Sequence, residues 1–505
     1  MATTTFTSAL VGLDAYRVSV EADLAPGLPR FQIVGLPDAS IQEARERVRS
    51  AIKNAGFGFP RGIVTVNLAP GHLRKAGTHY DLPIAIAILA AQNDIPKETL
   101  TGYLLWGELA LDGRLRGTRG ALSTALLAGR EGTRNLILPE ENGEEASLIP
   151  DAAIFTARTL GDVWRHLTSH EHLPLRASRA MDLASETQNL PDLAGIRGQA
   201  QARRALEIAA AGAHNLLLQG PPGSGKTLLA RSLPGILPKL TPDEAIESTQ
   251  IHSVAGLLPT RGHVATRPFR APHHSASSIA LVGGGPNPRP GEISLAHRGV
   301  LFLDEMPEFP RQVLEHLRQP LEDGYVTVSR AVGTVSFPAR FLLVGAMNPC
   351  PCGFATDPDR PCTCQPLAAE RYRRRLSGPL LDRIDLLIEA PKVPAIELAA
   401  DGDGEASTTV RARVQTARER QYARFEGTGF ATNAELSSDA VRKLLVLEPA
   451  ARNLVDRAVS RMRLSARGYF RLIKVARTIA DLAHSARIEE DHIAEALNYR
   501  ATNDA

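Results

Sequence analysis

The 505-residue sequence predicts an α/β protein organised around a phosphate-binding loop. Residues 220–227 read Gly-Pro-Pro-Gly-Ser-Gly-Lys-Thr and match the pattern G-x-x-x-x-G-K-[ST] at every fixed position. The apolar run 215–219 precedes the loop as a buried strand, and residues 228–233 follow it as a helix. A second apolar strand, 300–303, ends in two acids. This order of strand, glycine loop and helix places an anion site at one edge of a parallel sheet.

These two motifs supply the residues expected to bind ATP and Mg²⁺. Lys226 would reach the β- and γ-phosphates, and the Thr227 hydroxyl would bind Mg²⁺. Asp304 would hold Mg²⁺ through water, and Glu305 would orient and polarise the attacking water. Each motif alone has a simpler interpretation: the first could be an ordinary glycine turn, and the second a buried strand that ends in solvated acids. Because both occur in this order in one chain, we favour a nucleoside triphosphatase site. The expected nucleotide-binding set is Gly220, Pro221, Pro222, Gly223, Ser224, Gly225, Lys226, Thr227 and Asp304.

Two further polar residues follow apolar segments downstream. The strand 341–347 ends at Asn348, whose amide could hydrogen-bond the γ-phosphate or the attacking water. Arg383 lies in the segment 378–385 and could stabilise transition-state charge, in its own site or in a neighbour's. The structural alternative is that Arg383 pairs with a nearby aspartate, Asp382 or Asp385. Asn348 and Arg383 are therefore candidate catalytic residues.

The composition is that of an ordinary globular protein, 43% hydrophobic and 22% charged. The net charge of +3 does not by itself indicate nucleic-acid binding, so such a function must rest on local arginines. No apolar run reaches the ~18 residues of a membrane span, and the first residues lack the pattern of a signal peptide. We therefore expect a cytoplasmic protein without a membrane partner.

The chain divides by pattern into four parts. Residues 1–170 alternate strands and helices and predict one compact α/β or α+β unit. Residues 171–190 are polar and predict a linker. Residues 191–398 contain the nucleotide motifs, and 399–505 are helical. The expected strands of the first unit are 17–22, 31–35, 62–68 and 135–138, with helices at 40–54, opened by Asp38, and at 82–91.

The first unit resembles the proteolytic domain of the Lon family in the segments 107–113 and 136–142. That family uses a Ser–Lys dyad. The segment that would hold the serine, 76–83, has no serine, and the segment that would hold the lysine, 119–124, has no lysine. Without nucleophile and base there is no acyl transfer, so we expect a Lon-like fold without protease activity. His72 and His79 of this region are potential metal ligands, although ordinary loop histidines are the simpler interpretation.

The order of the nucleotide motifs resembles the AAA+ ATPases, in particular the magnesium-chelatase-like branch that includes the MCM helicases. By this resemblance Asn348 is the sensor-1 residue and Arg383 the arginine finger. Residues 192–199 look like the entry segment that packs near the adenine. Arg467, in the segment 465–469, is similar to sensor 2, with Arg471 as the alternative. The C-terminal helices match the helical lid of AAA+ proteins.

The succession of Lon-like domain, magnesium-chelatase-like AAA+ core and lid resembles the ComM/YifB family over essentially the whole chain. The resemblance implies a homohexameric, ATP-driven DNA motor that promotes branch migration of recombination intermediates, as in natural transformation. Single-stranded and branched DNA are its implied substrates, and recombination proteins are candidate partners. The alternative is a chelatase-type ATPase subunit that remodels a partner protein.

Two arginines are candidates for DNA contact. In residues 324–337, apolar and polar residues alternate on both sides of a glycine-containing turn, which predicts a β-hairpin. The hairpin is similar to the pre-sensor-1 hairpin of MCM helicases, and Arg330 would lie at its tip; a solvent-exposed turn arginine is the alternative. Arg261, in the loop 259–263, is the second candidate, because the family inserts another channel hairpin there.

All 4 cysteines lie in one proline-rich loop as C-x-C…C-x-C. Four thiolates suit a tetrahedral Zn²⁺ ion, although the spacing within each pair is tighter than usual. Disulfides are not expected in a reducing cytosol, and free buried cysteines are the alternative. Cys350, Cys352, Cys362 and Cys364 therefore form a candidate structural zinc site.

Overall fold

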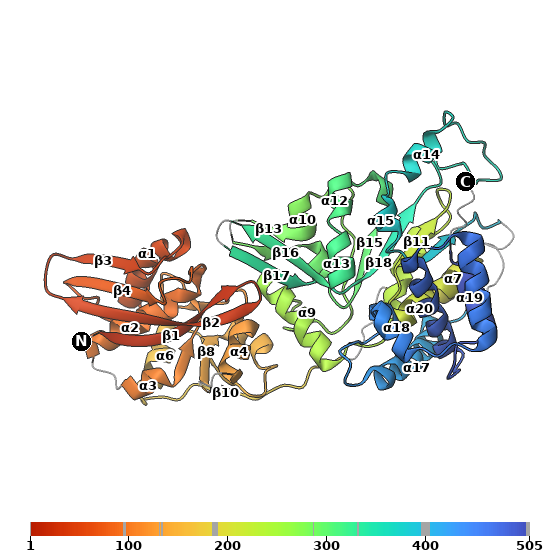
Figure 1. The fold of residues 1–505 in the computed structure, drawn as a ribbon. Helices are drawn as coiled ribbons and strands as arrows, with labels where there is room; N and C mark the ends of the chain where they lie inside the picture. The colour runs from red at the N-terminus through yellow and green to blue at the C-terminus, as the bar shows by residue number, and fades with distance from the viewer. Residues whose placement is uncertain are drawn as a thin grey trace.

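Two sheets, each packed with helices, follow one another along the molecule, and a group of helices completes it (Figure 1). The computed structural model describes residues 2–93, 97–130, 132, 135–183, 190–285, 287–330, 333–394 and 404–500. The N-terminal unit lies at one end of this row and the C-terminal helices at the other (Figure 1). The predicted α/β fold with a parallel-sheet core and a helical C-terminal part is confirmed.

The N-terminal unit is built on a mixed eight-stranded sheet with the strand order β10-β9-β8-β5-β1-β2-β4-β3. Its elements are β1 (Thr3–Val11), β2 (Asp14–Ala25), β3 (Arg30–Val34), α1 (Ala39–Asn54), β4 (Ile63–Ala69), α2 (Asp81–Asn93), α3 (Lys97–Thr101), β5 (Tyr103–Leu105), β6 (Glu108–Leu109), β7 (Leu115–Arg116), α4 (Ala121–Arg130), β8 (Asn135–Pro139), α5 (Gly143–Ala146), β9 (Ala153–Ala157), α6 (Leu160–Leu167) and β10 (Leu175–Arg176). All predicted strands and helices of this unit are present, with bounds shifted by a few residues.

Four strands of this sheet, β1, β5, β9 and β10, have no counterpart among the strands predicted from the sequence. β1 lies inside the sheet, antiparallel to β2 and parallel to β5. Two of its buried polar residues find partners there: Thr5 Oγ1 donates to the carbonyl of Pro83 at 3.0 Å, and Ser8 Oγ lies 2.8 Å from Thr124 Oγ1. β10 falls in the segment expected to be a linker, and it pairs with β9 at the edge of the sheet.

The second sheet is parallel, with the strand order β12-β15-β18-β11-β19. Its unit contains α7 (Ala200–Gly212), β11 (Leu216–Gln219), α8 (Lys226–Ser232), α9 (Pro242–Ala255), β12 (Phe269–Arg270), α10 (Ser278–Val282), β13 (Gly283–Gly284), β14 (Arg289–Pro290), α11 (Glu292–Leu295), β15 (Val300–Leu303), α12 (Arg311–Glu315), α13 (Arg318–Asp323), β16 (Tyr325–Arg330), β17 (Gly333–Pro338), β18 (Leu342–Met347), α14 (Ala368–Arg373), α15 (Gly378–Leu381) and β19 (Leu386–Glu389).

Both faces of this parallel sheet are buried, which explains why its strands are continuously apolar. In β11, Leu216 and Leu218 face one core and Leu217 faces another. The first core also contains residues of α7 and of the C-terminal helices, and the second contains α12 and the hairpin. The C-terminal helices therefore share a core with the sheet.

The C-terminal part comprises α17 (Ser407–Phe425), α18 (Ser438–Leu444), α19 (Pro449–Met462), α20 (Ala466–Leu482) and α21 (Glu490–Leu497). A buried ionic cluster ties two of these helices together. Asp481 of α20 is fully buried and pairs with Arg424 of α17 and with Arg477, whose Nη2 lies 3.0 Å from Oδ1. Asn433 Nδ2 donates to Asp481 at 2.9 Å.

The predicted hairpin is present as β16 and β17, paired from Tyr325 opposite Pro338 to Arg330 opposite Gly333. The middle of β17 meets the N-terminal unit, where the turn between β1 and β2 packs against it (Figure 1). Gly12 of this turn has φ of +65°, and a Cβ there would lie 2.5 Å from Val335 Cγ1. Leu13 joins the core that contains Phe337.

Helix α9 makes further contacts with the same turn and unit. Gln250 Nε2 donates to the carbonyl of Leu13 at 2.8 Å and to Ser123 Oγ at 3.1 Å. Ser253 donates to the buried carboxylate of Glu145, whose pKa burial raises. Within the described residues, no helix is both long and apolar enough to cross a membrane.

Candidate nucleotide-binding and metal sites

The phosphate loop joins the end of β11 to the start of α8, as the sequence predicts. Gly223 and Gly225 have φ of +78° and +85°, a backbone conformation that other residues rarely adopt. Both face open space, since a Cβ at either position would meet nothing within 4 Å. Gly220, in contrast, has no room for a side chain, because its Cβ would lie 2.1 Å from the carbonyl oxygen of Ala390. The glycines thus form an open cradle held against the end of β19.

Lys226 lies inside this cradle. Its Nζ donates to the carbonyls of Gly220 and Pro221, both at 2.8 Å, and lies 3.3 Å from Asn348 Oδ1. The side chain is largely buried, and burial lowers the pKa of Lys226. A buried ammonium bonded to neutral carbonyl and amide oxygens suits an anionic ligand, whose phosphates would supply the opposite charge.

The two residues predicted to bind Mg²⁺ lie side by side. Thr227 Oγ1 donates to Asp304 Oδ2 at 2.8 Å across the edge of the sheet, just beyond β15. A hydroxyl and a carboxylate oxygen are ligands of the kind that Mg²⁺ prefers, together with phosphate oxygens and water. The described residues therefore fit ATP with Mg²⁺, and the bound ion would neutralise charge on the phosphates.

Glu305 has a backbone φ of +48°, which is uncommon for a residue with a side chain. Its Oε2 lies 3.6 Å from Nδ1 of His274. The sequence analysis did not single out His274, because only folding brings the loop after β12 against the end of β15. Backbone strain of this kind is frequent at functional sites, and the Glu305 side chain is about half exposed.

Two further contacts support the cradle. Gln199, from the predicted entry segment, donates through Nε2 to the carbonyls of Ser224 at 3.1 Å and Pro391 at 2.6 Å. Tyr372 lies by the backbone of Asn348. Burial and the nearby charge of Glu308 raise the pKa of Tyr372 to about 12. The tyrosine therefore stays protonated. Neither residue had a role assigned to its side chain from the sequence.

Arg383 does not lie beside the phosphate loop of its own chain. It precedes β19, and its carbonyl accepts a hydrogen bond from Asn215 Nδ2 at 2.9 Å, at the start of β11. The loop begins at the opposite end of β11, five residues and about 16 Å away. The guanidinium pairs with Glu322 and donates to the Pro379 carbonyl at 2.7 Å, rather than pairing with Asp382 or Asp385.

Arg467 lies beside Arg383, with its Nη2 3.2 Å from Oε1 of the same Glu322. The alternative sensor-2 residue, Arg471, is more buried; its Nε lies 3.5 Å from Asp385 Oδ1. All three arginines line a cavity of about 550 Å³ whose walls carry eight arginine or lysine and five aspartate or glutamate side chains. This cationic cavity lies at the amino ends of the strands, opposite the cradle.

The two DNA-facing candidates differ in what the structure describes. Arg330 ends β16 at the hairpin tip, but its side chain lies outside the described residues. The segment around Arg261 is a turn rather than a hairpin, closed by the Gly262 N–H on the Pro259 carbonyl at 3.0 Å. It packs against the N-terminal unit, where a Cβ on Gly262 would lie 2.6 Å from Glu144 Cβ.

In the Lon-like unit, the segment that would hold a catalytic serine is packed inside. His79 is a buried residue rather than a loop histidine; its ring stacks on Trp106 at 3.6 Å between centroids, and burial lowers its pKa to about 3. His72 is exposed. Neither histidine belongs to a group of potential metal ligands in the described parts of the chain.

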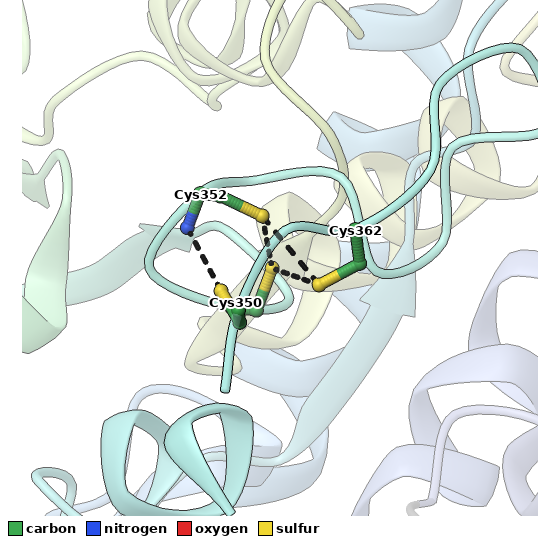
Figure 2. A group of neighbouring side chains, drawn as sticks. Cys350, Cys352 and Cys362 are labelled. Carbon is green, nitrogen blue, oxygen red and sulfur yellow. Dashed lines mark hydrogen bonds between the residues drawn. The ribbon is translucent and has the colours of Figure 1, made fainter. Parts of the chain in front are cut away.

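The cysteines, in contrast, converge. Figure 2 shows Cys350, Cys352 and Cys362 with their sulfurs directed at one another, 3.3 to 3.7 Å apart. The Sγ of Cys364 accepts from the Cys352 N–H at 3.4 Å, and all four sulfurs lie within 4.8 Å of one another. Zinc–thiolate bonds of about 2.3 Å place tetrahedral sulfurs about 3.8 Å apart. The four sulfurs therefore fit one tetrahedral ion, and they are thiols rather than disulfides.

Cys352 is the thiol best prepared to bind a cation. Backbone N–H groups, first that of Phe354, lower the pKa of Cys352 to about 5. Thiolates are the metal-binding form of cysteine, so this donor needs no further activation near neutral pH.

Family models match nearly the whole chain. The model described as magnesium chelatase, subunit ChlI, matches residues 192–398. Those described as subunit ChlI of Mg-chelatase and as the ChlI C-terminal part match residues 20–142 and 404–500. A Lon protease of Rhizobium meliloti is 28% identical over 188 residues, 35% of this chain and 23% of that protein.

Similarity to two bacterial proteins extends over almost the full length. The competence protein ComM of Haemophilus influenzae is 47% identical over 499 residues, 98% of this chain and 97% of that protein. The uncharacterized protein YifB of Salmonella typhimurium is 46% identical over 496 residues, 98% of this chain and 96% of that protein. Together with the cradle, the Mg²⁺ residues and the parallel sheet, these matches show that the chain belongs to the ComM/YifB family of magnesium-chelatase-like AAA+ ATPases.

Proposed function

We propose that this chain is an ATP-hydrolysing, hexameric DNA motor that promotes branch migration of recombination intermediates, as in natural transformation. The observation that carries the proposal is the β16–β17 hairpin. It leads directly into β18, the strand that ends at Asn348 beside Lys226. A displacement of β18 on ATP hydrolysis would therefore move the hairpin. The name of the competence protein ComM supports a role in DNA uptake.

Arg330 gives this hairpin its DNA-binding chemistry. A ring of six subunits would present six such arginines to the phosphate backbone of single-stranded or branched DNA. Contacts of this kind are independent of sequence and sensitive to salt. Arg261 is a weaker candidate than Arg330, because its turn packs against the N-terminal unit.

Assembly would complete the catalytic site. Arg383 and Arg467 lie together at the amino edge of the sheet, away from their own cradle. We infer that they act on ATP bound to the neighbouring subunit, where Arg383 would stabilise transition-state charge and Arg467 would contact the phosphates. Glu322 holds both arginines in the single chain and would release them to the nucleotide. Glu305 and Asn348 would position the attacking water from the nucleotide's own subunit.

We further propose that Cys350, Cys352, Cys362 and Cys364 bind one structural Zn²⁺ ion. The described sulfur distances support one ion rather than an iron–sulfur cluster, which needs room for several metal and sulfide atoms. Metal analysis of the purified protein tests this assignment, and absence of stoichiometric zinc would contradict it.

The test of the motor is steady-state ATP hydrolysis with and without single-stranded and branched DNA, at several salt concentrations. DNA should stimulate hydrolysis, and the stimulation should weaken steeply as salt rises. Arg330→Ala should keep basal hydrolysis and lower the salt slope of single-stranded DNA binding by about 4, the contribution of roughly six phosphate contacts. Arg452→Ala, an exposed arginine on α19, is the control.

A second candidate function, remodelling of a partner protein as in magnesium chelatase, is favoured by the ChlI family models. This function predicts that DNA does not change the rate of ATP hydrolysis. Insensitivity to both DNA forms at low salt would therefore reject the motor and direct the search to a protein partner.

A further inference from the structure

The four-cysteine loop touches the phosphate loop. It begins at Cys350, two residues after Asn348, and turns back at Gly353, which has φ of +86°. A Cβ on Gly353 would lie 2.6 Å from Cγ and 2.7 Å from Cδ of Pro222, inside the phosphate-binding motif. Gly353 is therefore in direct contact with the cradle, and its lack of a side chain permits the contact.

The same segment also holds the catalytic amide. Asn348 Oδ1 lies 3.3 Å from Lys226 Nζ, and the position of a Gly353 Cβ lies 3.9 Å from Asn348 Cγ. Residues 348–353 thus connect the cysteine cluster to two sides of the cradle, its lysine and its proline. A shift of the cluster would move both.

Little besides the cysteines fixes the shape of this loop. Between Met347 and Ala368 there is no helix or strand, and among the described residues 351–367 only Gly353 is buried. The remaining anchors are at the surface: Lys392 Nζ to Asp359 at 2.7 Å, and the Arg360 guanidinium over the Phe354 ring at 4.1 Å. A loop without its own core depends on a cross-link, and a metal bound by residues 350, 352, 362 and 364 closes it at both ends.

We propose that the metal on the four cysteines positions the ATP site: it presses Gly353 onto Pro222 and holds Asn348 against Lys226, so that metal occupancy sets nucleotide affinity. This inference rests on the proposed ATPase site and adds a regulatory input to it. Cys350, Cys352, Cys362 and Cys364 are then positioning residues, since their described side-chain hydrogen bonds lie within the four-cysteine loop and none reaches a cradle residue.

The test compares the full-length protein before and after removal of the metal by a thiol-competing chelator, followed by return to buffer with Mg²⁺. Zinc content and the affinity for a fluorescent ADP are measured on each sample. Removal of zinc should weaken ADP binding at least fivefold, and stoichiometric Zn²⁺ should restore it whereas additional Mg²⁺ should not. Circular dichroism reports whether the rest of the fold is retained.

Two variants separate the metal from the contact. Gly353→Ala keeps all four thiols, so it should retain zinc but lose ADP affinity, because its Cβ displaces Pro222. Thr363→Ala, between two of the cysteines and exposed, should retain both. The positioning role alone would be overturned if the protein bound ADP equally well with and without zinc. It would also be overturned if Gly353→Ala and the parent protein had the same ADP affinity. Failure of the zinc-loaded parent protein to bind ADP would overturn the nucleotide site as well, so the two failures are distinct.

Discussion

Lys226 lies inside the cradle and Glu305 beside it, and we expect the two residues to perform separable tasks. Lys226 is buried among loop carbonyls, where bound phosphates would reach it, whereas Glu305 is half exposed and lies beside His274. Loss of the lysine charge removes a binding contact. Loss of the glutamate charge would remove only the group expected to polarise water, so binding and turnover should respond to different residues.

Glu305→Gln should bind ATP with unchanged affinity and lose about 10²- to 10⁴-fold in turnover, the usual contribution of general-base catalysis. Single-turnover hydrolysis and equilibrium binding of a labelled nucleotide measure the two effects. Glu315→Gln, which alters a partly exposed glutamate paired with Arg318, serves as the control. Normal turnover in Glu305→Gln would remove this residue from the catalytic site.

At the scale of elements, α20 connects the C-terminal helices to the sheet. Its Asp481 is fully buried and pairs with Arg424 and Arg477, and its Thr478 Oγ1 lies 2.7 Å from His214 Nε2, next to the start of β11. Buried charges are tolerated only when paired and hydrogen-bonded. The helices are therefore fixed to the sheet by a network whose members depend on one another.

Asp481→Ala should destabilise the protein by about 3 to 5 kcal/mol, because it leaves two arginines without their buried partner. The free energy of unfolding in urea measures this change for the transition that reports on the C-terminal helices. Asp491→Ala, an exposed aspartate of α21, should change it by less than about 0.5 kcal/mol. Equal stability of the two variants would contradict the role of the buried cluster.

Across the whole molecule, the Lon-like unit contacts the part of the AAA+ core that carries the hairpin. The turn at Gly12 packs on Val335 of β17, and Gln250 of α9 binds the Leu13 carbonyl. If the unit has no protease activity, as its sequence leads us to expect, these contacts suggest a mechanical task for it. Under the proposed function, the unit would steady the middle of β17 when the hairpin contacts DNA.

Gly12→Ala tests this coupling, because the added Cβ would lie 2.5 Å from Val335 Cγ1. We expect basal ATP hydrolysis to persist and its stimulation by DNA to fall by at least half. Gly56→Ala is the matched control: Gly56 also has a positive φ, +87°, but nothing lies within 4 Å of its Cβ position. Equal DNA stimulation in both variants would exclude the hairpin contact as a coupling element.

A shared active site predicts complementation between inactive subunits. The Lys226→Ala subunit should not bind nucleotide but keeps Arg383. The Arg383→Ala subunit keeps its nucleotide site but lacks the arginine. Mixed rings should regain part of the hydrolysis that either variant lacks alone, because some cradles then face an intact Arg383. Mass measurements are the control that shows whether mixed rings form. Mixed rings without any recovery would place Arg383 outside the neighbouring site.

The sequence by itself determined the chemistry that is local along the chain. The phosphate loop, the two acids after β15 and the clustered cysteines are each written in a few consecutive residues, and strands β11, β15 and β18 were predictable because both their faces are buried. The hairpin followed from its alternation and glycine turn. These features depend on neighbours in sequence, which periodicity and motif spacing report directly.

Only the tertiary structure decided which residues from distant parts of the sequence lie close together and which lie at opposite edges of the sheet. β1 was missed because its buried residues are partly threonine and serine, whose hydrogen-bond partners come from distant segments and leave no apolar alternation. The place of Arg383 at the edge opposite the cradle, and that of His274 beside Glu305, depend on how parallel strands are ordered. The contact of Gly353 with Pro222 joins two loops 131 residues apart in sequence. Such pairings are set by long-range packing, which no local pattern encodes.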